Sequence, residues 1–169
     1  SALAKDGSFV AVAIENERDE DAGDGRVPQM PAGYVAILDV VDGLAVCDSL
    51  VKADVTGLAE VAPEDPEPEF VDVNEAGEIV VTLQENNHLV VMSKEGEILN
   101  HFSAGAVDLE GIDVDEERAL TFNAAQPGRK REPDAVKWID DDHFAIANEG
   151  DMDGGSRGWT IFTKDGSVA

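Results

Sequence analysis

A repeated unit of short apolar strands constrains the fold of this chain more than any other feature of its sequence. The segments 67–96 and 132–166 both open with Glu-Pro and an acidic residue, and both then contain three short strands. In each segment the second strand leads to a glutamate, and the third ends in Lys-x-Gly. The start of the chain, about residues 1–43, has the same second strand, glutamate and third strand. Repeats of antiparallel strands that cannot bury both faces alone are typical of a β-propeller.

The sequence therefore predicts an all-β fold in which residues 1–169 form a fragment of one β-propeller domain. The strands are rich in valine, isoleucine and aromatic residues, and Asp-Gly, Glu-Gly and Ala-Gly turns separate them. We expect about two to three blades, with an insertion at about residues 105–131. A closed ring needs at least four blades. We therefore expect the remainder of the propeller, or another copy of the chain, to complete the exposed sheet edges.

The segment 62–69, with the sequence APEDPEPE, joins the first and second repeat units. It is rich in proline and acidic residues, which favours an extended backbone without internal hydrogen bonds. We therefore expect this connector to lie exposed on the surface.

The chain is strongly acidic, with 37 Asp and Glu residues against 12 Lys and Arg residues and a formal net charge of −25. Such a field repels nucleic acids and anionic membranes, so we expect no nucleic-acid partner. No apolar run approaches the ~20 residues that a membrane-spanning helix requires, so we expect no membrane span. Two interpretations of the charge remain open. One is an acidic surface that keeps the protein soluble in salt, and the other is a set of carboxylate clusters that hold hard cations such as Ca²⁺.

Glu15, Glu85 and Glu149 fall in register when the three repeats are aligned. Equivalent positions of successive blades lie on one ring about a propeller's axis, so these carboxylates should face the same side. Like charges raise one another's pKa unless a cation lies between them, and Ca²⁺ takes roughly six to eight oxygen ligands. The predicted calcium ligands are Glu15, Glu85, Glu149, Asp151 and Asp153, with further oxygens on Asn16, Glu17, Asn86 and Asn87. The alternative, acidic turns whose side chains cap backbone N–H groups, remains open.

Two further loops could carry related chemistry. The acidic loop 17–25 has the composition of an irregular calcium loop, but it lacks the spacing and the final glutamate of an EF-hand. Arg157 follows the glycines of the loop after Glu149, where its guanidinium could bind the phosphate of a substrate or neutralise Glu149 or Asp151. Ser156 lies in Gly-Gly-Ser-Arg-Gly, which is not the strand-turn-helix setting of a serine nucleophile. The residues therefore assign no catalytic group.

The cysteine and the histidines predict no site. Cys47 is the single cysteine and cannot form an internal disulfide, and no Cys/His spacing is typical of a zinc site. We expect His88, His101 and His143 to occupy edge positions or to be satisfied by hydrogen bonds.

Two stretches resemble a known family. The sequences TLQENNHLVVMS and REPDAVKWIDDDHFAIANEGDMDGGSRGWTIF are similar to bacterial phytase-like β-propellers with esterase-like activity, which are often labelled alkaline phosphatases. The resemblance covers about residues 64–166, and residues 1–43 by pattern. It implies a secreted, periplasmic or extracellular propeller that binds calcium and acts as a calcium-dependent phosphoric ester hydrolase. A second interpretation, from another class, is a non-catalytic propeller scaffold or extracellular binding module.

Overall fold

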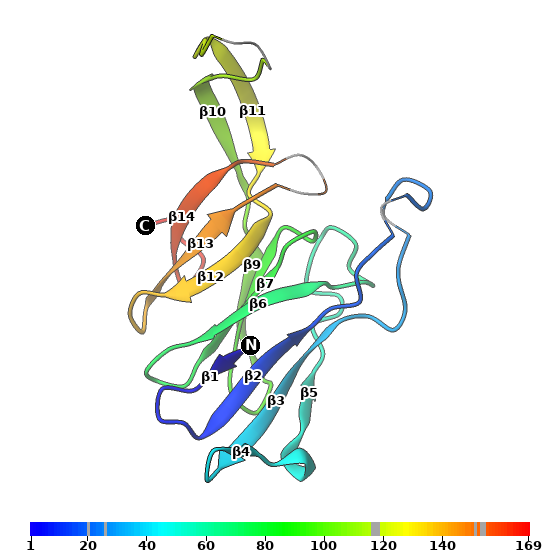
Figure 1. The fold of residues 1–169 in the computed structure, drawn as a ribbon, viewed down its shortest axis with the longest axis vertical. Helices are drawn as coiled ribbons and strands as arrows, with labels where there is room; N and C mark the ends of the chain where they lie inside the picture. Colours follow the sequence, from blue (N-terminus) through cyan, green and yellow to red (C-terminus); the bar gives the residue numbers. More distant parts are fainter. Residues whose placement is uncertain (20, 26, 116–118, 151, 153–154) are drawn as a thin grey trace.

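The fold is all-β, as the repeats predict, and it has the form of a partial propeller. A computed structural model describes residues 1–169 apart from 20, 26, 116–118, 151 and 153–154. Three antiparallel sheets follow one another along the molecule, and a two-stranded hairpin projects beyond the last of them (Figure 1). In the described part of the chain, no helix has the length and apolarity needed to cross a membrane.

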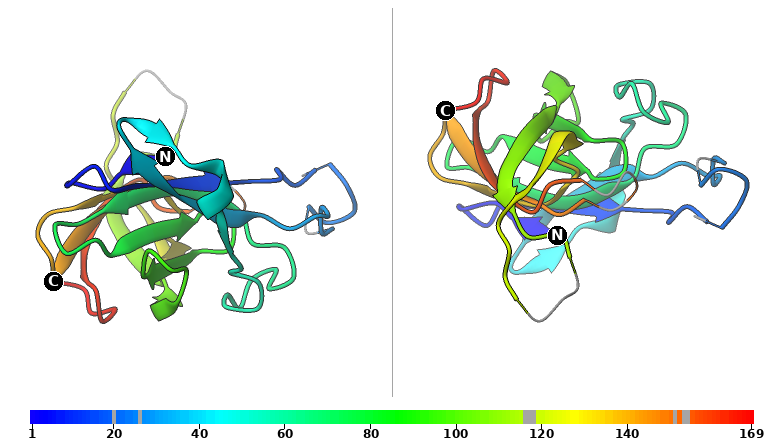
Figure 2. Two further views of the ribbon diagram at one scale, coloured as in Figure 1. Left: turned by 90° about the horizontal axis from the view of Figure 1, so that it is seen from below. Right: turned by 90° about the horizontal axis from the view of Figure 1, so that it is seen from above.

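The sheets are defined by the following strands. The first sheet contains β1 (Ala2–Leu3), β2 (Phe9–Ile14), β3 (Tyr34–Val41), β4 (Leu44–Ala45) and β5 (Val51–Ala53), with a 3-10 turn at Cys47–Ser49. The second sheet contains β6 (Pro68–Val73), β7 (Ile79–Leu83), β8 (His88–Met92) and β9 (Ile98–Ser103). The third sheet contains β12 (Pro133–Trp138), β13 (His143–Asn148) and β14 (Gly158–Thr163). The hairpin, β10 (Ala106–Ile112) and β11 (Ala124–Lys130), lies within the predicted insertion and projects at one end of the molecule (Figure 1), so that it overlaps the sheets when seen along the long axis (Figure 2).

The second sheet is the centre of the molecule, because both of its faces are covered. Ile79 and Val81 pack in one core cluster with residues of the first sheet, whereas Val80 and Val91 pack in another with residues of the third. Every residue of β7 and β8 is buried. Burial on both faces explains why these strands read as continuous apolar runs instead of alternating with polar residues.

The hydrogen-bonded ladders fix which residues are equivalent in the three sheets. The last pair between the second and third strands is Ile14 with Tyr34 in the first sheet, Leu83 with His88 in the second and Asn148 with Gly158 in the third. The residues that follow these second strands, Glu15, Gln84 and Glu149, are therefore equivalent. The predicted alignment of Glu85 with Glu149 is wrong by one residue.

The same ladders align the innermost strands of the second and third sheets. Pro68 pairs with Leu83, as Pro133 pairs with Asn148, and a bulge follows in both ladders. Glu69 is therefore equivalent to Asp134, and Glu67 to Glu132. The repeat consequently places carboxylates at matching points near the start of both inner strands.

Candidate functional site: an acidic pocket beside a buried arginine

The turn between β7 and β8 binds the connector that leads into the second sheet through Asn86, and the start of the third sheet through Asn87. The backbone N–H of Glu67 donates to Asn86 Oδ1 at 2.9 Å, and the backbone N–H of Glu132 donates to Asn87 Oδ1 at 2.9 Å. Asn87 has a φ of 49°, a left-handed conformation that asparagine adopts more readily than most residues. These two side-chain oxygens, predicted as additional calcium oxygens, serve here as hydrogen-bond acceptors within the fold.

The amide groups of the same two side chains complete the connection. Asn86 Nδ2 donates to the carbonyls of Val61, Ala62 and Asp65, and Asn87 Nδ2 donates to the carbonyl of Gly105. The turn therefore holds the connector before β6 and the chain segment between β9 and β10. The two asparagines of this turn therefore have a structural role, hydrogen bonding to the backbone, that requires no ligand.

Arg18 is a buried cation that the sequence did not single out. Its Nε donates to Asp65 Oδ2 at 3.1 Å, its Nη1 to Glu85 Oε2 at 2.8 Å and its Nη2 to the Asp65 carbonyl at 3.0 Å. Glu67 Oε1 lies 3.6 Å from Arg18 Nε. The acidic connector is thus not exposed as predicted, because Asp65 and Glu67 are buried against this guanidinium. The only sequence signal was an arginine inside an acidic run.

Glu67 is buried among acidic groups that one guanidinium does not fully balance. Desolvation by burial, followed by the hydrogen bond with Glu85 and its negative charge, raises the pKa of Glu67 to about 9. Arg18 opposes this shift and Asp65 adds to it. Glu67 is therefore protonated at neutral pH, and Arg18 binds the charges of Asp65 and Glu85.

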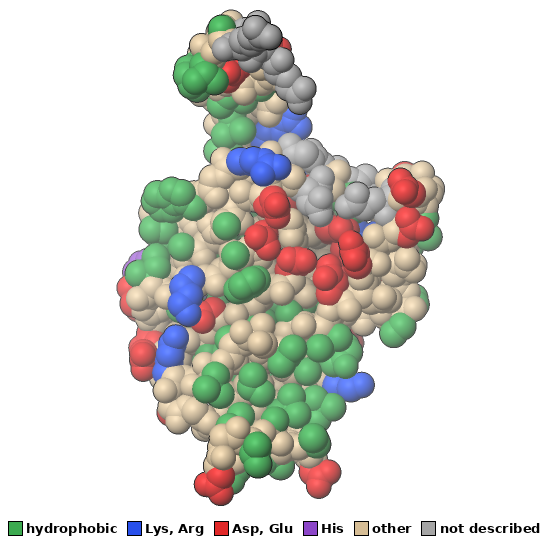
Figure 3. Space-filling model, viewed as in Figure 1, with side chains coloured by type: hydrophobic (Ala, Val, Ile, Leu, Met, Phe, Trp, Pro, Cys, Tyr) green, Lys and Arg blue, Asp and Glu red, His purple; other side chains and the backbone are tan. Residues whose placement is uncertain are grey.

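An acidic pocket adjoins this buried cluster. Five residues line a cavity of about 220 Å³, namely Glu15, Glu17, Glu69, Gln84 and Glu85. Figure 3 shows acidic side chains gathered on the visible face of the molecule, between the first sheet and the hairpin. Among the residues that the structure describes, the lining consists of four glutamates and one glutamine.

Carboxylates from all three sheets act on this pocket. Desolvation by burial, and then the charges of Glu15 and Asp134, raise the pKa of Glu69 to about 7, with a smaller contribution from Glu149. Gln84 Nε2 donates to Glu149 Oε2 at 3.1 Å, which links the ends of β7 and β13. The structure thus brings Glu15, Glu69 and Glu149 into one electrostatic neighbourhood, although sequence alone had not indicated Glu69 or Asp134. Their signal was the repeated Glu-Pro-acid motif at the start of two units.

The remaining predicted site residues are distributed differently. Glu85 lines the pocket, but its Oε2 accepts a hydrogen bond from Arg18. Asp151 and Asp153 lie outside the described residues. Arg157 is exposed, and within the described part of the chain it makes no hydrogen bond or ion pair. Among the residues that the structure describes, no three Asp, Glu, His or Cys side chains are grouped as a metal site.

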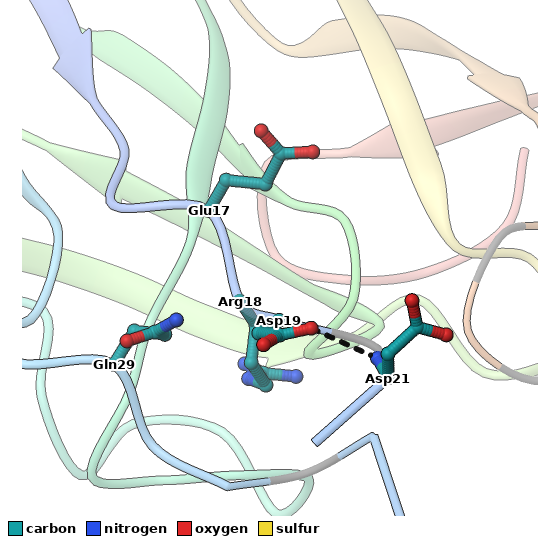
Figure 4. Close-up of a pocket in the computed structure, with 5 residues that line it drawn as sticks. All are labelled: Glu17, Arg18, Asp19, Asp21 and Gln29. Carbon is teal, nitrogen blue, oxygen red and sulfur yellow. Dashed lines mark hydrogen bonds between the residues drawn. The ribbon is translucent and has the colours of Figure 1, made fainter.

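The acidic loop after β2 forms a second, more open hollow. Glu17, Arg18, Asp19, Asp21 and Gln29 line a cavity of about 410 Å³ (Figure 4). Asp19 Oδ1 accepts the backbone N–H of Asp21 at 3.0 Å, and Asp65 Oδ2 accepts the backbone N–H of Gln29 at 2.8 Å. Figure 4 shows the Arg18 side chain directed away from the Glu17 carboxylate. Asp19 thus caps a turn, which is the alternative interpretation of this loop.

Two of the histidines have hydrogen-bonded partners within the sheet. His88 Nε2 and His101 Nδ1 are 3.0 Å apart on the neighbouring strands β8 and β9. Burial, and then the charge of His101, lowers the pKa of His88 to about 4. His143 Nδ1 lies 2.9 Å from Asp140 Oδ1 in an exposed turn.

No model of a known protein family matches this chain, and no curated protein sequence matches it. The fold and the pocket together define an all-β protein, part of a propeller, with an acidic cavity to which adjacent sheets contribute.

Replacing Arg18 with methionine should strongly destabilise the protein. The substitution keeps a long side chain but leaves Asp65 and Glu85 as buried charges without their cation, and losing one partner of a buried pair costs about 3–5 kcal/mol. Urea unfolding should show this loss. Arg157→Met is the matched control and should change the free energy of unfolding by less than about 0.5 kcal/mol. Equal effects of the two substitutions would contradict the role given to Arg18.

Replacing Glu67 with glutamine should change how stability depends on pH. Because the pKa of Glu67 is raised to about 9 in the folded protein, its contribution is complete below its unfolded value and is lost as pH rises through 9. Glutamine cannot ionise, so Glu67→Gln should become progressively more stable relative to the native protein between about pH 5 and 9. Urea midpoints across this range measure the difference. The exposed Glu64→Gln control should follow the native curve, and a parallel curve for Glu67→Gln would refute the assignment.

Proposed function

We propose that the acidic pocket binds Ca²⁺ and that the protein is a secreted propeller of the phytase-like type. One observation carries the calcium proposal: carboxylates contributed by adjacent sheets converge on one pocket, where the charges of Glu15, Asp134 and Glu149 help to raise the pKa of Glu69. The Arg18 guanidinium beside this pocket is buried and already bonded to Asp65 and Glu85. An external cation would reduce the repulsion among the carboxylates that act on Glu69.

The donor set suits a hard cation. Glu15, Glu17 and Glu69 offer carboxylates and Gln84 offers an amide oxygen, which are the ligand types that Ca²⁺ prefers. Glu15 and Glu17 are exposed, and their side chains are long enough to rotate toward a common ion. Glu149 would add an oxygen beside Gln84, and Asp151 and Asp153 remain predicted ligands. Ca²⁺ tolerates such irregular sets better than Mg²⁺, which demands near-octahedral geometry.

Phosphate esters are the substrate class that we propose for this pocket. A bound calcium ion would polarise a phosphoryl oxygen and lower the pKa of a water molecule. Calcium bound beside Glu69 would lower the pKa of this carboxyl from about 7 and hold it ionised as a ligand. The exposed Arg157 would bind a phosphate oxygen through its guanidinium.

The second candidate function is a non-catalytic propeller scaffold or extracellular binding module. It is favoured by the structural use of the motif that resembles the phytase-like group. Asn86 and Asn87 bind backbone groups, and Glu85 binds Arg18. Such a motif would be retained by a propeller whether or not it hydrolyses a substrate.

The sheet edges support the proposed partner, a further part of a propeller or another copy of the chain. The second sheet has four strands and the third has three. In the described residues, β14 pairs with β13 along its length and otherwise forms a single bridge, between Phe162 and Val168. A strand supplied alongside β14 would complete the third sheet.

Calcium should raise the thermal unfolding midpoint of the protein. Binding to the folded state stabilises it by mass action, by about 1.4 kcal/mol when calcium is at about ten times its dissociation constant. Glu69→Gln and Glu149→Gln should each reduce the shift, because each removes a carboxylate near the pocket. Differential scanning fluorimetry in calcium and in chelator, at constant ionic strength, measures it.

Glu64→Gln, in the exposed part of the connector, is the control and should retain the full shift. Equal midpoints in calcium and chelator would refute the calcium site. Release of inorganic phosphate from a phosphate ester, measured on the calcium-loaded protein, separates the two candidate functions. Calcium binding without phosphate release would support the scaffold and overturn the hydrolase.

A further inference from the structure

Two sheet faces of this molecule are largely apolar, apart from Lys52 on the first sheet and Lys137 on the third, and in the described part of the chain no other sheet covers them. In the second sheet both faces are buried, one against the first sheet and the other against the third. The first and third sheets each have one face packed in this way, and among the described residues no sheet packs against the opposite face. The residues on those outer faces can be compared with their buried equivalents in the second sheet.

The outer face of the first sheet repeats a face that is buried in the second. Its cross-strand pairs are Val10 with Leu38, Val12 with Ala36 and Ile14 with Tyr34. Their equivalents in the second sheet are Ile79 with Met92, Val81 with Val90 and Leu83 with His88, and all six are buried. Val10, Val12 and Ile14 are half-buried, and Leu3, paired with Val10, is 56% exposed. Figure 3 shows hydrophobic side chains gathered over this part of the molecule.

The outer face of the third sheet repeats the other buried face. Its pairs are Ala145 with Ile161 and Ala147 with Trp159, equivalent to Val80 with Val91 and Thr82 with Leu89. Leu89 is completely buried, whereas Trp159 is 72% exposed. A sheet face in water normally carries polar residues, so an exposed tryptophan beside isoleucine and alanine marks a contact surface.

We propose that a second copy of this chain packs head to tail on these faces, the third sheet of one copy against the first sheet of the next. The two uncovered faces are the two halves of the sheet-on-sheet contact that the molecule already forms twice. A second copy supplies both halves, so the contact continues an interface present within the chain. Unlike a symmetric dimer contact, it joins different surfaces and closes into a ring when the rotation permits.

Charge sets the conditions under which this association forms. Each chain carries a formal net charge of −25, so copies repel one another at low salt. At physiological ionic strength, screening reduces repulsion between charges more than about 8 Å apart, while burial of the apolar faces is unaffected. The proposal depends on neither calcium binding nor hydrolysis.

Two lysine substitutions test the head-to-tail contact. Val12→Lys blocks the first-sheet face and Trp159→Lys blocks the third-sheet face, while Phe122→Lys, at a 64% exposed position beside the hairpin, is the control. Light scattering at physiological salt should give the native protein and the control a mass above one chain. Each blocked variant alone should have the mass of one chain. Their equimolar mixture should form a two-chain species, because each variant retains the face that the other lacks.

Three outcomes would overturn the proposal. A native protein with the mass of one chain at concentrations on the order of 0.1 mM excludes a second copy as the occupant and assigns the faces to another partner. Association of Val12→Lys or Trp159→Lys alone indicates a symmetric contact, and loss of association in Phe122→Lys places the contact at the hairpin. A cooperative thermal transition confirms that each variant folds. Leu3→Lys, at a position already exposed, replaces Val12→Lys if that variant does not fold.

Discussion

The side chains of Asn86 and Asn87 fix the segments that enter the inner strands of the second and third sheets, and much of the remaining structure depends on them. Asn86 accepts a hydrogen bond from the backbone N–H of Glu67, just before β6, and Asn87 accepts one from the backbone N–H of Glu132, just before β12. Buried backbone donors need partners. A proline, which has no backbone N–H, follows each of the two glutamates, so neither strand can start with a regular pattern of backbone hydrogen bonds. The turn after β7 supplies the missing acceptors, which places the inner strands side by side.

This arrangement also determines where the charges lie. With the inner strands fixed, Glu67 and Asp65 are buried beside Arg18, while Glu69 faces the pocket with Glu15 nearby. The acidic residues thus fall into two groups with different physical roles. One group is neutralised within the fold by a guanidinium and by protonation, whereas the other lines a pocket for which we propose a cation from solution. The net charge of the chain conceals this distinction.

The sequence predicted the all-β class because alternation, turn residues and repetition are local signals. Aligning the repeats by residue identity placed Glu15, Glu85 and Glu149 at equivalent positions. The hydrogen-bonded ladders instead align Glu15 and Glu149 with Gln84. The turn after β7 is tight and the loop after β13 is long, so sequence alignment could not locate the last ladder pair. Arg18 was missed because its partners Asp65 and Glu85 are distant in the chain. The proline-rich, acidic composition of the connector 62–69 predicted exposure to solvent. Ion pairs with Arg18, which is distant in the chain, bury Asp65 and Glu67 instead.

The most direct test of this account is the free energy of unfolding of Asn87→Gly. Glycine accepts the positive φ of this position, so the substitution removes the side-chain hydrogen bonds to Glu132 and Gly105 without straining the turn. Because the buried N–H of Glu132 then loses its acceptor, we expect stability to fall by about 1–3 kcal/mol. The loss should be the same in calcium and in chelator. A change below about 0.5 kcal/mol, or a loss seen only in calcium, would contradict the claim that this turn joins the sheets.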